Sequence, residues 1–181
     1  MPYLVITGAS AGIGAATAEL FQNNGFDIVN LSCKPCPVAG VTNIPCDLAQ
    51  PDFIQKIEND LLNALGDSAQ IALIHNAALL INDNIASTDS EQLRRVLEIN
   101  VVAASSLNQL LIPRMGAGSS VLYVGSTLGE KAVPNSFTYA TSKHAVIGMM
   151  RATCQDLAGS GVHTVCINPG FTNTEMLREH V

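Results

Sequence analysis

The sequence predicts an α/β fold of the Rossmann type, a doubly wound parallel sheet of about six strands in three α/β/α layers. Short apolar runs alternate with longer segments of helical periodicity along the 181 residues, and a glycine-rich turn follows the first run. Hydrophobic residues make up 48% of the chain and charged residues 13%, which suits strands buried on both faces. Since no linker or repeat interrupts the pattern, residues 1–181 are expected to form a single domain.

Charge and hydropathy argue against two classes of partner, nucleic acid and membrane. The formal net charge of −6 argues against nucleic acid or an anionic membrane surface. No uninterrupted apolar run reaches the roughly 18 residues that a membrane span needs. Strand-like sequence begins at Tyr3, which leaves no room for a signal peptide. We therefore expect a cytoplasmic protein that binds neither membrane nor nucleic acid.

An odd number of cysteines without a secretion signal favours reduced thiols over a disulfide framework. Cys33 and Cys36 form a C-x-x-C motif, but a zinc site would need a second ligand pair, and only Cys46 lies near in sequence. The prolines on either side of Cys36 oppose the helix that a redox pair usually opens. We expect no metal site; a metal or thiol redox protein is an alternative that depends on this motif alone.

The first three segments of the chain form a possible phosphate cradle. An apolar strand at Tyr3–Thr7 leads into glycines spaced G-x-x-x-G-x-G over residues 8–14, and a helical pattern then runs to Gly25. The glycines allow the backbone to approach a pyrophosphate, and the helix begins with free N–H groups and a positive dipole end. The structural alternative is a tight turn that serves only close helix–strand packing.

The end of the second strand bears on the choice of cofactor. Dinucleotide folds that select NAD place a carboxylate there to bind the adenosine ribose. The strand Asp27–Ser32 instead ends with a small hydroxyl, and Lys34 follows, which leaves room for a 2′-phosphate. NADP is therefore favoured and NAD remains possible. Residues 33–42, which lead to a strand at 41–46, are too short and proline-rich for a crossover helix, so part of one sheet face should be thinly covered.

Polar residues lie at the ends of the middle elements. Asp47 is expected to cap the third strand or the helix at 51–65, and a strand at Ile71–His75 follows. His75 is expected to be packed or capped rather than catalytic. A long helix over residues 90–112, capped by Asp89 or Ser90, encloses Asn100, an amide in apolar company that needs hydrogen-bond partners.

Ser126 to Lys143 is the stretch with the clearest chemistry. Ser126 ends a predicted strand at 119–125, and a helix from Phe137 or Tyr139 to Leu157 places Tyr139 and Lys143 on one face, about 5–6 Å apart at Cβ. A cation held there would stabilise phenolate and lower the pKa of Tyr139 toward working pH. The alternative is an exposed surface pair. A last strand is predicted at residues 162–167.

These motifs, in this order, resemble the short-chain dehydrogenase/reductase family over almost the whole chain. The matching pieces are Thr7-Gly8-x-x-x-Gly12-Ile13-Gly14, Asp47, Asn76-Ala77, Asn100, Ser126, Tyr139-x-x-x-Lys143 and Pro169-Gly170. The resemblance implies an NAD(P)-dependent oxidoreductase that transfers hydride between nicotinamide and a carbonyl or alcohol. Tyr139 would be the general acid/base, and Lys143 would lower its pKa and hold the nicotinamide ribose. Ser126 would hydrogen-bond the substrate oxygen, and Asn100 would position a water.

The resemblance also implies a set of cofactor contacts. The pyrophosphate half would meet Gly8, Ser10, Gly12, Ile13 and Gly14. The adenosine would meet Asp47, Leu48, Asn76 and Ala77, beside Ser32 and Lys34. The nicotinamide end would meet Tyr139, Lys143, Pro169, Gly170, Thr172 and Thr174.

Three departures from the family pattern bear on function. Ala78 stands where the family usually has glycine, and the helix between the second and third strands is missing. The chain also stops where the family adds a substrate-covering segment and a last strand, so strand 162–167 is expected to be an unprotected edge. A catalytically idle dinucleotide-binding sensor or complex subunit is therefore the alternative function. The helices at 90–112 and 139–157 resemble those that pair subunits in this family, which implies a homodimer or homotetramer.

Overall fold

The computed structural model describes residues 1–178 and contains a six-stranded, all-parallel sheet in the order β3-β2-β1-β4-β5-β6. The strands are β1 (Tyr3–Thr7), β2 (Asp27–Ser32), β3 (Thr42–Pro45), β4 (Ile71–His75), β5 (Ser120–Val124) and β6 (His163–Ile167). The chain runs outward from β1 to β3 and then returns to β4, so the strand order reverses between β1 and β4. The predicted Rossmann-type fold is confirmed.

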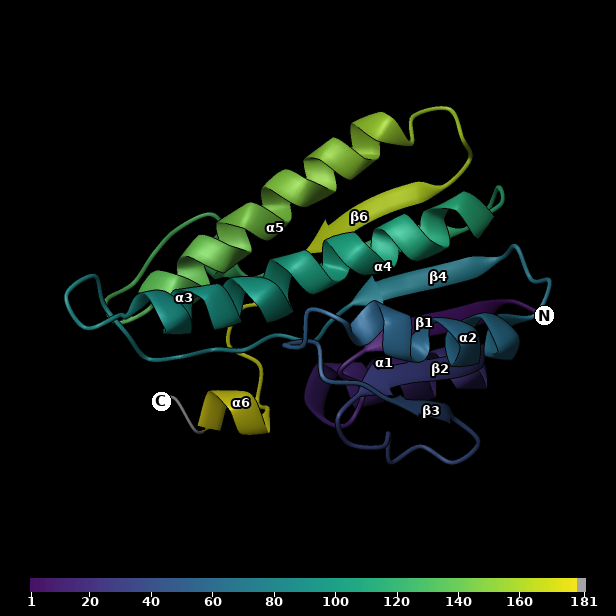
Figure 1. Ribbon diagram of the computed structural model, residues 1–181, viewed down its shortest axis with the longest axis horizontal. Coiled ribbons are helices and arrows are strands. Elements are labelled where there is room, and N and C mark those ends of the chain that lie inside the picture. Colours follow the sequence, from purple (N-terminus) through teal and green to yellow (C-terminus); the bar gives the residue numbers. More distant parts are fainter. Residues whose placement is uncertain (179–181) are drawn as a thin grey trace.

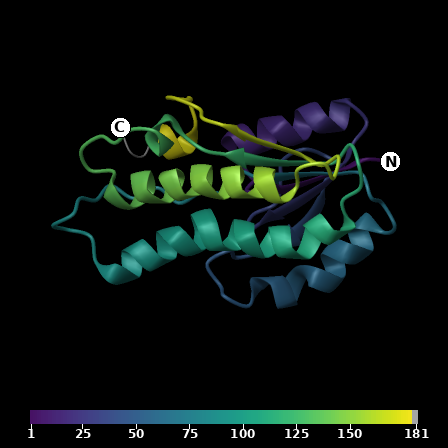
Figure 2. The same ribbon diagram turned by 90° about the horizontal axis from the view of Figure 1, so that it is seen from above.

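Helices cover the two faces of the sheet unequally. They are α1 (Gly12–Asn23), α2 (Phe53–Leu65), α3 (Ser90–Leu97), α4 (Ala103–Leu111), α5 (Phe137–Asp156) and the short α6 (Glu175–Arg178). The two views agree that α2, α4 and α5 lie on one face and α1 on the other (Figures 1 and 2). Because all strands are parallel, their carboxyl ends share one edge, toward which the arrows of β4 and β6 point in Figure 1.

The core lies in two layers, one on each face. On the better covered face, apolar side chains at every fourth position of α2, from Phe53 to Leu65, pack with Leu107 and Leu111 of α4 against the sheet. On the other face, Ala18 of α1 packs against residues of β1 and β4. These two strands are therefore buried on both sides, as their unbroken apolar runs predict.

The thin cover expected on one face is confirmed. No helix forms between β2 and β3, and α1 is left as the main cover of that side. On β6 the side chains of Val165 and Ile167 are each 42% exposed. Within residues 1–178 no strand pairs with the outer side of β6, so the expected unprotected edge is also confirmed.

The helix predicted over residues 90–112 is present, but its middle is a π-helical turn rather than regular α-helix. Asp89 caps α3 as expected, accepting from the N–H of Gln92 at 2.7 Å. A π-helical turn (Glu98–Val102) then separates α3 from α4. Asn100 lies inside this turn, and its side chain bonds outside the helix, which gives a physical reason for the extra residue.

Asp47 does not cap a helix. Its carboxylate accepts from the backbone N–H of Ala49 at 3.0 Å and from the side chain of Gln50 at 3.3 Å, closing the turn after β3. The following helix begins only at Phe53, after Asp52. Five intervening residues therefore put Asp47 out of reach of the first helical N–H groups.

One helical stretch qualifies the expectation on membrane spans. Among the described residues, the helical stretch Ser90–Arg114 is 25 residues long and contains an 18-residue window that is apolar enough to cross a membrane, by length and composition alone. Its apolar side chains Val96, Leu107 and Leu111 are fully buried in the protein core. Packing on the sheet therefore accounts for part of this composition, since 39% of the most apolar 18-residue window is buried.

Candidate active site

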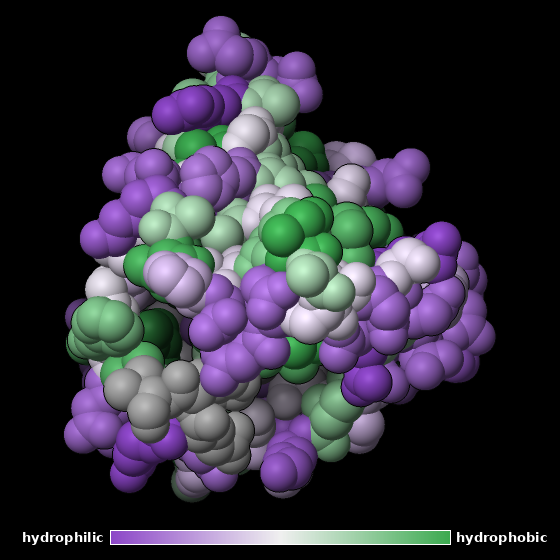
Figure 3. Space-filling view, turned by 90° about the vertical axis from the view of Figure 1, so that its left-hand side faces the viewer, coloured by the Kyte–Doolittle hydropathy of each residue, from purple (hydrophilic) through white to green (hydrophobic). Residues whose placement is uncertain are grey.

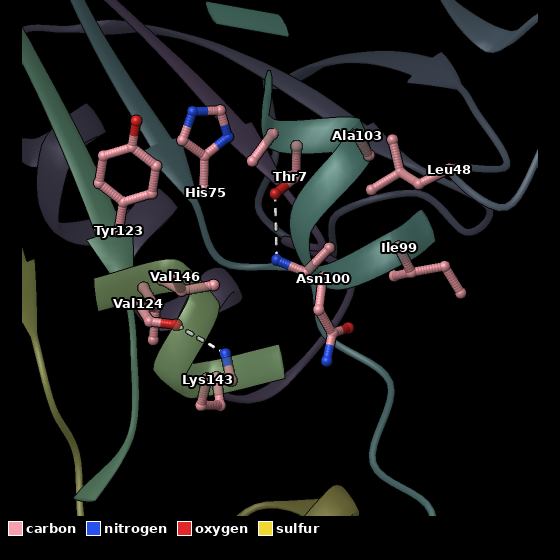
Figure 4. Close-up of a pocket in the computed structure, with 12 residues that line it drawn as sticks. Thr7, Leu48, His75, Ile99, Asn100, Ala103, Tyr123, Val124, Lys143 and Val146 are labelled. Carbon is pink, nitrogen blue, oxygen red and sulfur yellow. Dashed lines mark hydrogen bonds between the residues drawn. The ribbon is translucent and has the colours of Figure 1, made fainter. Parts of the chain in front are cut away.

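The candidate site opens at the edge where the parallel strands end. Figure 3 looks onto this side of the molecule, where apolar surface is interspersed among hydrophilic surface. A narrow cavity behind it is lined by residues from the ends of β1, β4 and β5, from the π-helical turn and from α5. Figure 4 shows Thr7, Asn100 and Lys143 converging on this cavity from three different elements.

The glycine turn between β1 and α1 is shaped for close backbone contact. Gly8 and Gly12 have positive φ angles of 71° and 55°, which favour glycine. A Cβ on Gly14 would collide with the carbonyl oxygen of Gly8 and lie 2.5 Å from the Asn76 amide nitrogen. Helix α1 begins without a side-chain cap and without an acid in its first turn. An uncapped helix start beside bare backbone fits a bound phosphate group.

Two polar side chains hold this turn in place: Thr7, which belongs to the glycine motif, and Asn30, which the sequence analysis did not single out. Asn30, buried in the middle of β2, accepts from the N–H of Ala9 at 3.0 Å. The Thr7 hydroxyl accepts from the N–H groups of Asn76 and Ala77, both at 3.0 Å. An amide in the centre of an otherwise apolar strand was the available signal, because buried polar groups need partners.

Asn76 acts mainly as a brace. Its side-chain nitrogen donates to the carbonyl oxygens of Thr7 and Gly8, each at 3.0 Å. Both amide hydrogens are thereby used within the protein. Asn76 links the end of β4 to the glycine turn, and Ala77 packs directly against Gly8. Both residues thus help to fix the shape of the glycine turn.

The residues predicted for the adenosine end lie at the carboxyl ends of β2 and β3. The Ser32 hydroxyl accepts from the N–H of Lys34 at 3.4 Å. The Lys34 side chain is exposed and forms no salt bridge with any described residue. Leu48 is buried and lines the same cavity as Lys143, whereas Asp47 is exposed above it.

The segment after β6 lies over the glycine turn. The carbonyl of Pro169 accepts from the N–H of Thr127, and the Thr172 hydroxyl donates to the carbonyl of Gly170. The side chain of Thr174 lies 3.1 Å from the position that a Cβ on Gly12 would take. The structure thus brings Thr174 next to Gly12, whereas Pro169 is bonded to the turn that follows β5.

Ser126, Tyr139 and Lys143 gather where β5 ends. Ser126 follows β5, accepts from the N–H of Leu128 at 3.1 Å and is hydrogen-bonded to the Tyr139 side chain. The Lys143 ammonium donates to the carbonyl of Val124 at 2.7 Å and lies 5.5 Å from the centre of the Tyr139 ring. Figure 4 shows the Lys143–Val124 contact as a dashed line. All three side chains are buried, which contradicts the surface-pair alternative.

The expected fall in the pKa of Tyr139 is wrong for this structure. Burial raises the pKa of the phenol above its usual value, and the hydrogen bond with Ser126 opposes this only in part. Burial also lowers the pKa of Lys143 to about 8. The Lys143 ammonium is directed at the Val124 carbonyl, so desolvation outweighs the attraction of the cation for phenolate. The Tyr139 phenol is accordingly neutral near neutral pH.

Asn100 links three elements beside this pair. Its oxygen accepts from the N–H of Leu79 at 2.7 Å, and its nitrogen donates to the carbonyl of Leu79 and to the hydroxyl of Ser142, which precedes Lys143. Both amide hydrogens are thus committed to protein groups. The water-positioning role implied by the resemblance would have to use its remaining lone pair or the backbone of the π-helical turn.

His75 is packed, as expected. Its Nε2 lies 2.8 Å from the oxygen of Asn108, whose nitrogen donates to the Tyr123 hydroxyl at 2.7 Å. Burial lowers the pKa of His75 to about 4. Since the Asn108 oxygen can only accept, Nε2 carries the proton and His75 is neutral at physiological pH.

The cysteines and metal-binding residue types form no obvious centre. Within residues 1–178 no group of three or more His, Cys, Asp or Glu side chains is placed to hold a metal ion, and all five cysteines are free. Burial raises the pKa of the Cys46 thiol to about 12, with a smaller effect of neighbouring Cys33. Such a thiol is a poor nucleophile and a poor metal ligand at neutral pH.

Comparison with protein families and curated proteins gives a consistent result. A family model described as short chain dehydrogenase matches residues 3–181. The short chain aldehyde dehydrogenase 1 of Euphorbia lathyris is 26% identical over 189 aligned positions. That alignment covers 96% of this chain but only 64% of the plant protein. The chain therefore spans about two thirds of this relative's length.

Solved structures resemble this one over nearly the whole chain. A short chain dehydrogenase from Burkholderia cenocepacia in complex with NADP has a TM-score of 0.88 and 26% identity, covering 97% of this chain and 76% of that one. A Brucella ovis oxidoreductase of the short-chain type with a partially ordered NAD has a TM-score of 0.84 and 29% identity. The latter match covers 93% of this chain and 82% of that one.

Proposed function

The chain belongs to the short-chain dehydrogenase/reductase family, and on that premise we propose that it is an NAD(P)-dependent oxidoreductase acting on a carbonyl or alcohol substrate. The observation that carries the proposal is the buried group of Ser126, Tyr139 and Lys143 at the same sheet edge as the glycine turn. Related structures hold NADP and NAD in this fold.

The residues of the chain fit such a cofactor. The uncapped start of α1 and the bare backbone of Gly8 and Gly14 would receive the diphosphate. Asp47, Leu48 and Ala77 would flank the adenosine, and Thr172 and Thr174 the carboxamide. A nicotinamide dinucleotide bound there would supply or accept the hydride.

Tyr139 would deliver the proton. Its raised pKa keeps the phenol protonated at neutral pH, so it can donate to the oxygen of a carbonyl as that oxygen gains charge. Ser126, which is hydrogen-bonded to Tyr139 in the free protein, would turn its single hydroxyl hydrogen to the same substrate oxygen. Lys143 is buried with a pKa of about 8 and is therefore still a cation at pH 7. Its charge would stabilise the phenolate that Tyr139 becomes once it has given its proton to the substrate oxygen.

NADP is the cofactor we propose over NAD. The exposed, unpaired Lys34 beside Ser32 would meet a 2′-phosphate, and no acid stands at the end of β2 to repel it. The net charge of −6 supports a small-molecule substrate rather than nucleic acid or membrane, and we keep a cytoplasmic location as part of the proposal. The long α4 and α5 remain the proposed surfaces of a homodimer or homotetramer.

A second candidate is a dinucleotide-binding sensor or complex subunit without turnover. One observation favours it: the Lys143 ammonium is bonded to the Val124 carbonyl, and the pKa of Tyr139 is raised rather than lowered. This candidate and the oxidoreductase predict the same cofactor binding. They differ only in whether a carbonyl is reduced.

The test is a titration with NADPH and NADH followed by a carbonyl-substrate screen that compares wild type with Tyr139→Phe. We expect tighter binding of NADPH and turnover of at least one small carbonyl. Because the substitution removes the proton donor and little else, turnover should fall about 10²- to 10⁴-fold with cofactor affinity nearly unchanged.

The matched control is Tyr123→Phe. Tyr123 is also a buried tyrosine, but its hydroxyl bonds to Asn108 and Thr153 away from Ser126. This variant should keep its turnover while losing some stability, about 1 kcal/mol. NADPH binding without reduction of any carbonyl by wild type would exclude the enzyme and leave the sensor.

A further inference from the structure

We propose that Asp83 is a positioning residue that holds the first turn of α5, and with it Tyr139, at the mouth of the site. Asp83 lies in the loop between β4 and α3, more than fifty residues from Tyr139 in sequence. The inference rests on the proposed function, because it concerns the placement of the proposed proton donor. Its structural part can be tested without any turnover.

Helix α5 lacks a cap of its own. Ser136 occupies the N-cap position, but its hydroxyl donates to the carbonyl of Val133 at 2.7 Å and makes no cap hydrogen bond. The first turn of α5 also contains no acidic residue. The first N–H groups of a helix have no intrahelical partner and need one elsewhere. Here they need a partner from outside the helix.

Asp83 supplies two of these partners. Its carboxylate accepts from the N–H of Thr138 at 3.0 Å, and its backbone carbonyl accepts from the N–H of Phe137 at 3.2 Å. The N–H of Asp83 in turn donates to the carbonyl of Asn135 at 3.2 Å, so that Asp83 and Ser136 form a short parallel bridge. We call this set of contacts the Asp83 clamp.

The Asp83 carboxylate is itself fixed in place. It is buried, and its second oxygen accepts from the Thr88 hydroxyl at 2.6 Å. Burial alone would raise the pKa of Asp83, but the hydrogen bonds from Thr88 and Thr138 hold it below its usual value. The carboxylate is therefore charged at neutral pH and lies at the positive end of the α5 dipole.

The loop before α5 makes the external cap necessary. Asn135 has a φ of 61°, the positive φ of a non-glycine residue, directly after Pro134. Asparagine tolerates this conformation better than other side chains, and proline before it favours a tight turn. The turn draws the Ser136 hydroxyl back to Val133 and leaves the Thr138 N–H open to Asp83.

The Asp83 clamp affects the candidate site because it holds the residue next to Tyr139. Thr138 is the residue before Tyr139, so the clamp fixes the backbone from which the phenol projects toward Ser126. Two further contacts hold this part of α5 against the end of β5. Tyr139 is bonded to Ser126, and Lys143 donates to the carbonyl of Val124. Asp83 ties α5 to a second segment as well, the loop that follows β4. A displacement of about 1 Å in a reacting group can cost about a hundredfold in rate.

The experiment compares Asp83→Ala and Asp83→Asn with Asp89→Ala in the full chain. Asp89 caps α3 with the same carboxylate–N–H geometry, at 2.7 Å from the N–H of Gln92, and is the matched control. With the carbonyl found in the screen, Asp83→Ala should lower kcat about 10- to 100-fold while the Kd for NADPH stays within about twofold. Asp83→Asn keeps an acceptor for the Thr138 N–H and should recover most of kcat.

Amide hydrogen exchange is the second measurement, and it needs no substrate. Exchange at residues 137–139 should become about three- to thirtyfold faster in Asp83→Ala, whereas Asp89→Ala should speed exchange only near residues 90–93.

The outcomes separate the two proposals. Unchanged exchange and unchanged kcat in Asp83→Ala, or an equal loss of kcat in Asp89→Ala, overturn the clamp while leaving the oxidoreductase proposal intact. If wild type reduces no carbonyl, the proposed function fails, and faster exchange at 137–139 alone then supports the clamp as the cap of α5.

Discussion

At the scale of single residues, burial affects the pKa values of Tyr139 and Lys143 more than their pairing on α5 does. Tyr139 and Lys143 stand four residues apart on α5, yet the Lys143 ammonium bonds to a backbone carbonyl, and desolvation raises the pKa of the phenol. Burial likewise lowers the pKa of His75 to about 4. In each case the buried environment favours the neutral form over the charged one.

His75 gives a pH prediction with a definite sign. Its folded pKa of about 4 lies below its ordinary value of 6.5, so between these values the unfolded chain binds more protons. The contribution of His75 to the free energy of unfolding is therefore fully present above pH 6.5. It falls by about 3 kcal/mol in all as the pH drops toward 4. Denaturant unfolding at several pH values should show a shallower acid loss in His75→Gln than in wild type.

The control for this prediction is His144→Gln. His144 is exposed on α5, so its replacement should leave the pH dependence of wild type unchanged. Parallel pH curves for wild type and His75→Gln would mean that His75 is not the buried neutral group described here.

At the scale of elements, the site is assembled by the turns that follow the parallel strands. The turn after β1 depends on glycine because Gly14 lies against the carbonyl of Gly8 and the side chain of Asn76. The turn after β4 meets the first turn of α5 through Asp83. The π-helical turn places Asn100 between Leu79 and Ser142. Each connection joins segments that are far apart in sequence.

The close contacts of Gly14 predict what a single added methyl group would do there. Gly14→Ala would force Gly8 or Asn76 to move, which should cost about 1–3 kcal/mol of stability and abolish tight NADPH binding. Thermal unfolding and fluorescence titration measure the two effects.

Gly148→Ala is the matched substitution. Gly148 lies within α5, and a Cβ there would meet nothing within 4 Å. Alanine should therefore stabilise the protein by about 0.5–1 kcal/mol and leave NADPH binding intact. Normal binding by Gly14→Ala would show that the turn does not approach the cofactor.

At the scale of the whole molecule, the two faces of the sheet are covered unequally. Helices α2, α4 and α5 lie on one face and α1 on the other (Figure 2). On β6, Val165 and Ile167 are partly open to solvent. Apolar surface next to an unpaired strand edge is prone to association.

This asymmetry predicts where a hydrophobic dye binds. The double variant Val165→Thr/Ile167→Thr should bind less anilinonaphthalene sulfonate than wild type, with stability lowered by no more than about 1 kcal/mol because each side chain is already 42% exposed. Val102→Thr on the helical face, where Val102 is 43% exposed, is the control and should leave the dye signal unchanged. A drop in signal only for Val102→Thr would place the apolar surface on the helices instead.

The sequence alone determined the fold and the chemical types at the site. Apolar runs alternating with helical periods predict a parallel sheet, and the confirmed bare loop after β2 follows from prolines in a segment too short for a crossover helix. The residues that the motifs single out are local features of strand ends and helix starts. Local patterns of this kind can be recognised without knowing which residues they contact in the folded protein.

Only the tertiary structure decided how those residues are held and charged. The roles of Asn30 and Asp83, the π-helical turn at Asn100 and the bond from Lys143 to Val124 all depend on groups brought together by the sheet. The raised pKa of Tyr139 depends on burial, which no spacing reveals. Hydrogen bonding and desolvation act through distance in space, and sequence separation does not fix that distance.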